Sequence, residues 1–198
     1  MKRKDLEHVI REVGRRSGLE YFYIIGSAAA LASLPASQDE TLVGTRDVDV
    51  IPSPPDPSKI QDYADKLDAW LGEGSPFDEQ YGYYVQGVDF TTPTYAPAGW
   101  RERAIPVRVG GFTGLCMELH DLALSKYGAG REKDLEFTAA LAKTGAIRQV
   151  LLEERLSAVT APEALLELMR ARIQADFSPA VANQTLLRLT TPKFPTTR

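Results

Sequence analysis

The segment from Tyr21 to Leu34 constrains the fold most, because its character changes twice over a short length. Residues Tyr21–Ile25 are aromatic or β-branched, which predicts a buried strand. Gly26 and Ser27 follow as a turn, and the alanine- and leucine-rich run 28–34 has high helix propensity. A strand, a turn and a helix in such quick succession indicate a domain that mixes strands and helices.

A second strand is predicted over residues 46–51, where charged and aliphatic residues alternate. The prolines at 52, 54, 55 and 57 end it, because proline cannot continue a hydrogen-bonded ladder.

The remaining pattern divides the chain into two parts. Amphipathic helices are expected at residues 4–16 and 60–71, and further strands at 83–90 and 105–109. Loops are expected at 38–44 and 72–82. From Glu118 the pattern is helical, with helices at 118–127, 132–143, 147–156 and 162–175, and the tail 177–198 has no clear period. We therefore expect an α/β (α+β) fold: a small mixed-sheet core at residues 1–112, a glycine-rich seam near 110–114, and a C-terminal helical region at 113–198 packed on the core.

The composition excludes several kinds of site. Cys116 is the only cysteine, so an internal disulfide and a tetrahedral thiolate metal site are both excluded. His8 and His120 are too few for a multi-histidine site, and His120 is expected to pack at a helix start. The formal net charge of −4 argues against a broad footprint on duplex DNA, although a local basic pocket stays open.

Neither a membrane span nor a leader is expected. No apolar run approaches the roughly 20 residues that cross a bilayer, and residues 1–11 lack the apolar centre of a signal peptide. With a single cysteine, the chain fits a reducing cytoplasm.

The strongest chemical signal is the pair Asp47 and Asp49. Residues two apart on a strand point to the same face, so their carboxylates project together. Two such charges repel, and a divalent cation would relieve the repulsion; hard oxygen ligands suit Mg²⁺, which also takes water and phosphate oxygens. The alternative is a polar, solvent-facing strand.

Gly26 and Ser27 strengthen this interpretation. Glycine between a strand and a helix allows close approach of a ligand to the backbone, and a helix start can bind phosphate. Ser27 could instead be a plain helix cap. Together the turn and the acids supply the two halves of a metal–triphosphate site.

These motifs resemble a known superfamily. Ile25-Gly26-Ser27 after a strand, followed by Arg46-Asp47-Val48-Asp49-Val50 on the next, looks like the signature of the polymerase β-like nucleotidyltransferases. The resemblance implies that Asp47 and Asp49 bind metal, with Asp89, in Val88-Asp89-Phe90, as the candidate third ligand. It also assigns Gly26, Ser27 and Arg46 to the nucleotide.

A second resemblance covers later motifs. Leu122-Ala123-Leu124-Ser125-Lys126, with Arg131-Glu132-Lys133-Asp134 after it, is similar to bacterial nucleotidyltransferases of the abortive-infection toxin (AbiEii) type, and more so to a related bacterial group of nucleotidyltransferases of unknown function. By position it points to Lys126 and Asp134, and Arg131 is a further nucleotide-binding candidate. On the residues alone, Lys126 and Arg131 could enter a cleft at the bend near Gly128, or belong to a solvated helix face.

The resemblance implies an Mg²⁺- or Mn²⁺-dependent transfer of a nucleoside monophosphate from an NTP to an acceptor hydroxyl. In that reaction Asp47, Asp49, Asp89 and Lys126 would be catalytic. The acceptor could be RNA such as tRNA, a protein or a small molecule, and a toxin-like version would have an antitoxin-like partner protein. The alternative is a non-catalytic nucleotide-binding or toxin–antitoxin module on the same fold.

Overall fold

The computed structural model describes residues 1–178 of the 198-residue chain. The helices are α1 (Arg3–Ser17), α2 (Glu40–Val43), α3 (Ile60–Leu71), α4 (Pro76–Tyr81), α5 (Leu119–Ala129), α6 (Glu132–Lys143), α7 (Gln149–Leu156) and α8 (Glu163–Phe177), with 3₁₀ turns η1 (Ser27–Ala32) and η2 (Pro57–Lys59). The strands are β1 (Tyr21–Ile25), β2 (Asp47–Pro52), β3 (Tyr84–Gly87), β4 (Ile105–Val109) and β5 (Phe112–Cys116). Within the described residues, none of the helices has the length and apolar character that crossing a membrane requires.

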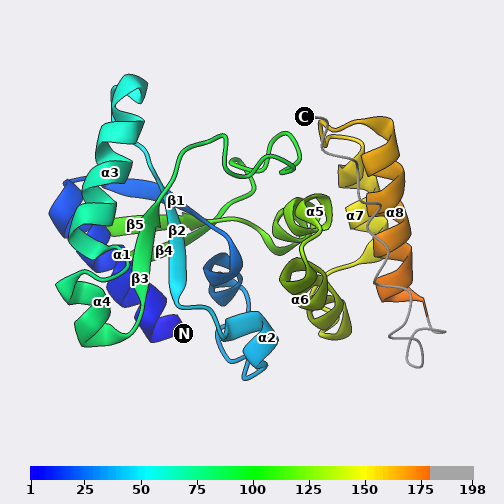
Figure 1. Cartoon of the computed structure of the whole chain (residues 1–198), viewed down its shortest axis with the longest axis horizontal. Helices are drawn as coiled ribbons and strands as arrows, with labels where there is room; N and C mark the ends of the chain where they lie inside the picture. Colours follow the sequence, from blue (N-terminus) through cyan, green and yellow to red (C-terminus); the bar gives the residue numbers. More distant parts are fainter. Residues whose placement is uncertain (179–198) are drawn as a thin grey trace, which may run out of the picture.

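The five strands form one mixed sheet in the order β3-β2-β1-β5-β4 (Figure 1). β1 lies in the middle, antiparallel to β2 and parallel to β5, and β3 runs parallel to β2. The register pairs Ile25 with Asp49, and Asp49 with Gln86. These pairings place the Gly26 turn beside the second acid of the Asp-x-Asp motif.

Helices α1 and α3 cover one face of the sheet. Two glycines on that face mark the close packing: a Cβ on Gly114 would lie 2.8 Å from Ile10 of α1, and one on Gly87 would lie 2.2 Å from the Ala64 carbonyl oxygen of α3. Val48 and Val50 are fully buried on this face. Because side chains alternate along a strand, Asp47 and Asp49 point to the opposite face.

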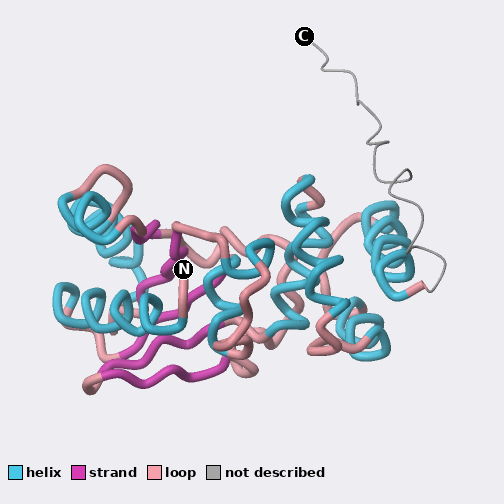
Figure 2. Tube along the Cα trace, turned by 90° about the horizontal axis from the view of Figure 1, so that it is seen from below, coloured by secondary structure: helices cyan, strands magenta, loops and turns pink. Residues whose placement is uncertain are grey.

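The opposite face looks toward the C-terminal helices α5–α8, which form a separate layer beside the sheet (Figures 1 and 2). The connection 88–104 runs over this face, where Phe90 and Trp100 both pack edge-on against Tyr23 of β1. It also reaches the helical layer, where the Ala98 amide donates to the Ala158 carbonyl. The site therefore lies between the sheet and the helices.

The predicted fold class, a mixed sheet with helices followed by a helical region, is confirmed. The helix expected over 28–34 is present as the 3₁₀ helix η1, which ends at Ala32. Other local expectations are wrong: the predicted loops 38–44 and 72–82 contain the short helices α2 and α4, and the strand expected at 83–90 is limited to β3.

The glycine-rich stretch 110–114 lies at the turn between β4 and β5 and at the start of β5. Gly110 and Gly111, both with positive φ, turn the chain between β4 and β5, and Phe112–Cys116 is a strand inside the sheet. The division into domains at residue 112 stays a prediction, and the sheet continues to Cys116. Of the tail 177–198, residues 179–198 lie outside the described part of the chain.

Candidate functional site

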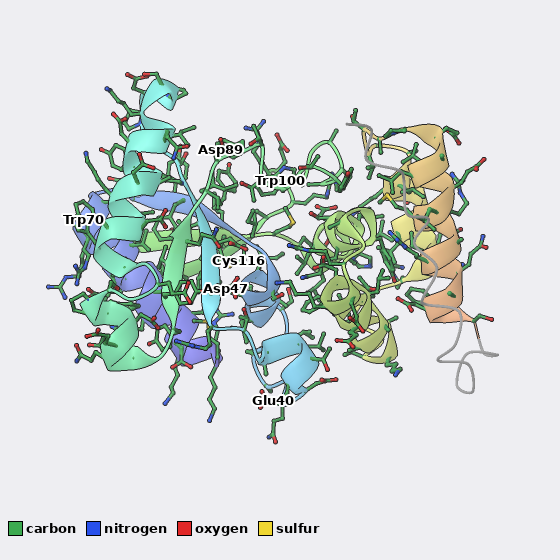
Figure 3. All side chains as sticks on the ribbon, in the orientation of Figure 1. Glu40, Asp47, Trp70, Asp89, Trp100 and Cys116 are labelled. Carbon is green, nitrogen blue, oxygen red and sulfur yellow. The ribbon has the colours of Figure 1, made fainter. Side chains whose placement is uncertain are left out.

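Asp47 and Asp49 lie near the start of β2, on the face opposite to the buried Val48 and Val50. Figure 3 labels Asp47 on this strand. Both side chains are half-buried. The Thr45 hydroxyl donates to the Asp47 carboxylate, which orients that group. The two acids share one face, as their spacing predicts.

Gly26 presses directly against the second acid. Its backbone has φ 67° and ψ −170°, a conformation that only glycine adopts readily. A Cβ at this position would lie 2.1 Å from Oδ2 of Asp49, closer than any side chain can sit. The turn after β1 and the Asp-x-Asp motif therefore meet at one point.

The Asp49 carboxyl is electrostatically unusual. Burial, together with the neighbouring Asp47, raises its pKa from 3.8 to about 6, and the charges of Lys126, Lys133 and Arg131 act in the opposite direction. A buried carboxylate beside a like charge calls for a cation. Those three basic residues belong to the helical layer, so that layer faces the acids.

Lys126 of α5 supplies the nearest buried cation on that side. Its side chain is almost fully buried, with Nζ 3.1 Å from Oδ1 of Asp134 and 4.5 Å from the centre of the Phe137 ring. Burial lowers the pKa of Lys126, while Asp134 acts to raise it. Asp134 thus holds an ammonium group that would otherwise be costly to bury.

Asp134 also binds Arg131. Nε of Arg131 donates to Oδ2 of Asp134 at 2.6 Å, and the guanidinium group stays 66% exposed. Burial alone would raise the pKa of Asp134, but hydrogen bonds and charge from Arg131 and Lys126 lower it. One fully buried carboxylate therefore positions two cations, one buried and one open to solvent.

These groups border one cavity of about 340 Å³. The sheet contributes the end of β1, the turn after it and Asp49. The connection after β3 contributes the run Thr92–Tyr95, and α5 and α6 contribute the basic residues. The lining residues are Ile25, Gly26, Asp49, Thr92, Pro93, Thr94, Tyr95, Met117, Leu122, Ser125, Lys126, Ala129, Arg131 and Asp134. Five residues singled out in the sequence (Gly26, Asp49, Lys126, Arg131 and Asp134) thus line one space.

Four predicted residues are not among those that line this cavity: Ser27, Arg46, Asp47 and Asp89. Ser27 follows the Gly26 turn as the first residue of η1, and Asp47 precedes Asp49 by two residues on β2. Arg46 donates to the Gly82 carbonyl and to Asp78 of α4, each at 2.9 Å, and borders a different cavity. Asp89 follows β3 in a turn, where its carboxylate accepts from the Thr91 amide and hydroxyl; the hydroxyl and amide of Thr91 lower its pKa. Within residues 1–178, no three His, Cys, Asp or Glu side chains form a group that could hold a metal ion. The assignments of Arg46 and Asp89 stay predictions.

Two features of the site are absent from the sequence-based expectations. The register places Gln86 of β3 beside Asp49 on the same face. The run Thr92–Tyr95 forms a wall of the cavity. Strand alternation predicts which face of the sheet Gln86 lies on only once the pairing of β3 with β2 is known. Apart from its proline, the run 92–95 has no sequence pattern that would indicate a binding site.

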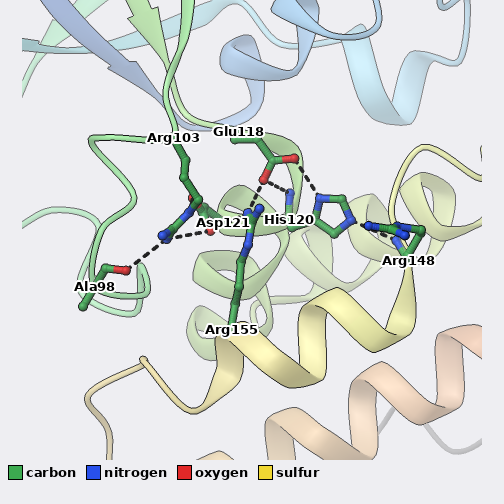
Figure 4. A network of polar contacts seen from close by, with 7 residues as sticks. All are labelled: Ala98, Arg103, Glu118, His120, Asp121, Arg148 and Arg155. Atoms are coloured by element: carbon green, nitrogen blue, oxygen red, sulfur yellow. Dashed lines mark hydrogen bonds and ion pairs between the residues drawn. The ribbon is translucent and has the colours of Figure 1, made fainter.

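A polar network fixes the start of α5 (Figure 4). Fully buried Asp121 accepts from Arg103 Nε at 2.8 Å and from Arg155 of α7 at 2.9 Å. Arg155 also donates to Glu118, the N-cap of α5, and burial of that carboxyl is outweighed by His120 and Arg155, which lower its pKa to about 2. These ion pairs hold the basic side of the cavity in place.

His120 belongs to this network. Its Nδ1 contacts Glu118 at 2.7 Å, and its Nε2 accepts from the Arg148 amide at 2.9 Å. This buried position agrees with the expected packing role. Cys116 is likewise buried, and burial raises the pKa of its thiol to about 12.

The donor set suits a cation carried by a phosphate. Asp47 and Asp49 are two carboxylates on one face, and burial together with the charge of Asp47 raises the pKa of Asp49. Mg²⁺ binds through one or two carboxylates and completes its shell with water and phosphate oxygens. The residues present fit such an ion, and do not fit a cation held wholly by protein ligands.

Comparison with known proteins gives one match. A family model described as nucleotidyltransferase of unknown function (DUF6036) matches residues 3–177, which include every element from α1 to α8. No curated protein and no solved structure matches the chain.

Proposed function

Because the chain belongs to the DUF6036 family of nucleotidyltransferases of unknown function, we propose that it transfers a nucleoside monophosphate from an NTP to an acceptor hydroxyl, with Mg²⁺ or Mn²⁺. The observation that carries this proposal is the contact of Gly26 with Asp49 across a cavity from Lys126 and Arg131. Asp49, an acid for a metal, and Lys126 and Arg131, cations for a polyphosphate, border the same space.

Each group has a role that its position supports. Asp47 and Asp49 would hold the metal, which would neutralise phosphate charge in the transition state. Gly26, which lines the cavity, and the adjacent Ser27 would contact the phosphates. Lys126 and Arg131 stabilise the charge that develops on the leaving pyrophosphate. Asp134 is a positioning residue, since it acts through these two cations.

The transfer forms one bond and breaks one. The acceptor oxygen bonds to the α-phosphorus, the bond from that phosphorus to the oxygen bridging to the β-phosphate breaks, and pyrophosphate leaves with the electron pair. The hydroxyl proton passes to solvent or to a nearby carboxylate.

Incubation of the chain with α-labelled NTPs and cellular RNA, protein or small molecules tests the proposal by label transfer. Asp49→Ala is expected to keep the fold and to lose Mg²⁺-dependent nucleotide binding, measured by calorimetry and thermal shift. Asp62→Ala is the control, because Asp62 is an exposed acid of α3, 56% open to solvent. Nucleotide binding retained in Asp49→Ala would contradict the assignment.

A nucleotide-binding module without transfer is the second candidate, and one observation favours it. Within residues 1–178 no third acid joins Asp47 and Asp49. Nucleotide binding without label transfer to any acceptor would establish this candidate. Transfer of label would exclude it.

The acceptor, the toxin-like role with its antitoxin-like partner, and the cytoplasmic location stay predictions. Separate reactions with tRNA, protein and small-molecule fractions identify the acceptor by the fraction that takes up label. Growth arrest on overexpression, relieved by Asp49→Ala, would support the toxin-like version and the relation to abortive-infection toxins.

A further inference from the structure

One wall of the cavity takes no part in the chemistry proposed above. It is formed by the run Thr92–Tyr95 after β3, together with Met117 and Leu122 at the start of α5. Met117 and Leu122 are almost fully buried and Tyr95 is half-buried, so the wall is mainly apolar. Asp49 and Asp134, with Lys126 and Arg131, border another part of the cavity.

Tyr95 packs closely on α5 at Gly128. A Cβ at Gly128 would lie 2.4 Å from both Cβ and Cγ of Tyr95, so only glycine allows the ring this close. A glycine inside a helix costs about 1 kcal/mol relative to alanine. This destabilising glycine lies in α5, two residues after Lys126, the lysine proposed to contact the phosphates.

The run that carries Tyr95 is shaped by its own hydrogen bonds. The Ala96 amide donates to the Pro93 carbonyl at 2.9 Å, and the Thr94 hydroxyl donates to the Thr91 carbonyl at 3.1 Å. Pro93 is buried and fixes the backbone further. Tyr95 is therefore held at the cavity, packed against Gly128 of α5.

We propose that this wall binds the nucleobase of the NTP, with the Tyr95 ring as a flat contact for the base. The inference rests on the proposed function and names the subsite for the non-phosphate part of its substrate. A base has apolar faces and polar edges. The apolar wall suits the faces, and the Thr92, Thr94 and Ser125 hydroxyls at the cavity suit the edges.

Binding measurements with two ligands separate base from phosphate. The ligands are an NTP analogue with a methylene between the α- and β-phosphates, and ribose 5′-triphosphate, which lacks only the base; both are measured with Mg²⁺. Stacking of a base on an aromatic ring contributes about 1–3 kcal/mol. Because about 1.4 kcal/mol corresponds to a factor of 10 in affinity, the unaltered chain should bind the best NTP analogue at least about 5-fold more tightly than ribose triphosphate.

Tyr95→Leu removes the flat ring and keeps side-chain volume over Gly128. It is expected to reduce the preference for the analogue to about twofold or less and to leave ribose triphosphate binding unchanged. Tyr95→Phe should restore the preference. Tyr21→Leu is the control, since Tyr21 is 47% exposed at the other end of β1.

Three outcomes would overturn the inference. Equal affinity of the unaltered chain for both ligands would exclude a base subsite, whatever the variants do. An unchanged preference in Tyr95→Leu would place the base elsewhere, and equal loss of both ligands would assign Tyr95 to the phosphates or to the fold. If the unaltered chain binds neither ligand, the proposed function fails, and the inference fails with it.

Discussion

At the residue scale, Gly26 combines a backbone conformation that favours glycine with a close contact to Asp49. Gly26→Ala would place a Cβ 2.1 Å from Asp49 Oδ2, in a backbone region that alanine rarely adopts. We expect a loss of about 1–3 kcal/mol in the free energy of unfolding and a nucleotide affinity reduced at least about 10-fold. Urea unfolding and calorimetry measure the two effects.

Gly18→Ala is the matched control for this change. Gly18 has a similar φ of 72°, and a Cβ there would meet nothing within 4 Å. It should lose about 1 kcal/mol of stability at most and keep full nucleotide affinity. Unchanged affinity in Gly26→Ala would show that the turn and Asp49 are not part of one site.

Asp49 should lower stability at neutral pH. Its pKa in the folded chain, about 6, exceeds the ordinary value of 3.8, so the folded state binds the proton more tightly than the unfolded state. The free energy of unfolding should therefore fall as pH rises from about 4 to 6, by about 2–3 kcal/mol in total. Asp49→Asn should raise the free energy of unfolding by up to about 2–3 kcal/mol at pH 7.5 and should leave it unchanged near pH 4.

Thermal and urea unfolding in chelator measure this pH dependence. Asp62→Asn, at an exposed position, should change stability at neither pH. A destabilised Asp49→Asn at pH 7.5 would show that the carboxylate is compensated in the folded chain, contrary to its raised pKa.

The sequence predicts part of the site at this scale. Strand alternation correctly predicts that Asp47 and Asp49 share a face, because the spacing is local. It does not place Arg46 or Asp89, since each is held by a partner that folding supplies, Asp78 for the first and Thr91 for the second. Ion pairs between elements form only in the tertiary structure, so the periodicity of the sequence does not predict them.

At the element scale, long periodic elements are predicted well. The bounds of α3, β4 and α6 agree with the expected ranges, because apolar spacing extends over their whole length. Short elements are missed where their cause is tertiary. β5 carries a glycine at 114, and that glycine is needed because Ile10 of α1 packs against it.

Gly128→Ala in α5 tests such a tertiary cause. Helix propensity alone predicts a gain of about 1 kcal/mol, whereas the Cβ would lie 2.4 Å from Tyr95. We expect a net loss of about 1–3 kcal/mol in the free energy of unfolding, as for other overpacked positions. In a Tyr95→Gly background, which removes the atoms that would clash, the same change should be neutral or stabilising. A gain in the free energy of unfolding in the unaltered background would show that the packing of Tyr95 does not require glycine at position 128.

At the scale of the whole molecule, the cavity lies between the sheet and the helical layer, so its geometry depends on what joins them. The connection 88–104 contributes Arg103, and α7 contributes Arg155; both guanidinium groups meet on Asp121. The sequence predicts that the helices pack on the core, because each has an apolar side. It does not predict this junction, because three charges distant in the chain become partners only after folding.

Asp121→Asn tests whether this junction makes the chain unfold as one unit. The variant leaves Arg155 and Arg103 facing a neutral amide in a buried position, and removing one partner of a buried ion pair costs about 3–5 kcal/mol. We expect a loss of this size, and because the helical layer is then free to loosen first, separate transitions by near-UV and far-UV circular dichroism in place of coincident ones. Asp62→Asn, which breaks the exposed pair with Lys59, should stay within about 0.5 kcal/mol of the unaltered chain. A single coincident transition in Asp121→Asn with unchanged stability would show that sheet and helices are held together by their apolar contact alone, and that the cations facing Asp49 need no buried carboxylate at position 121 to stay there.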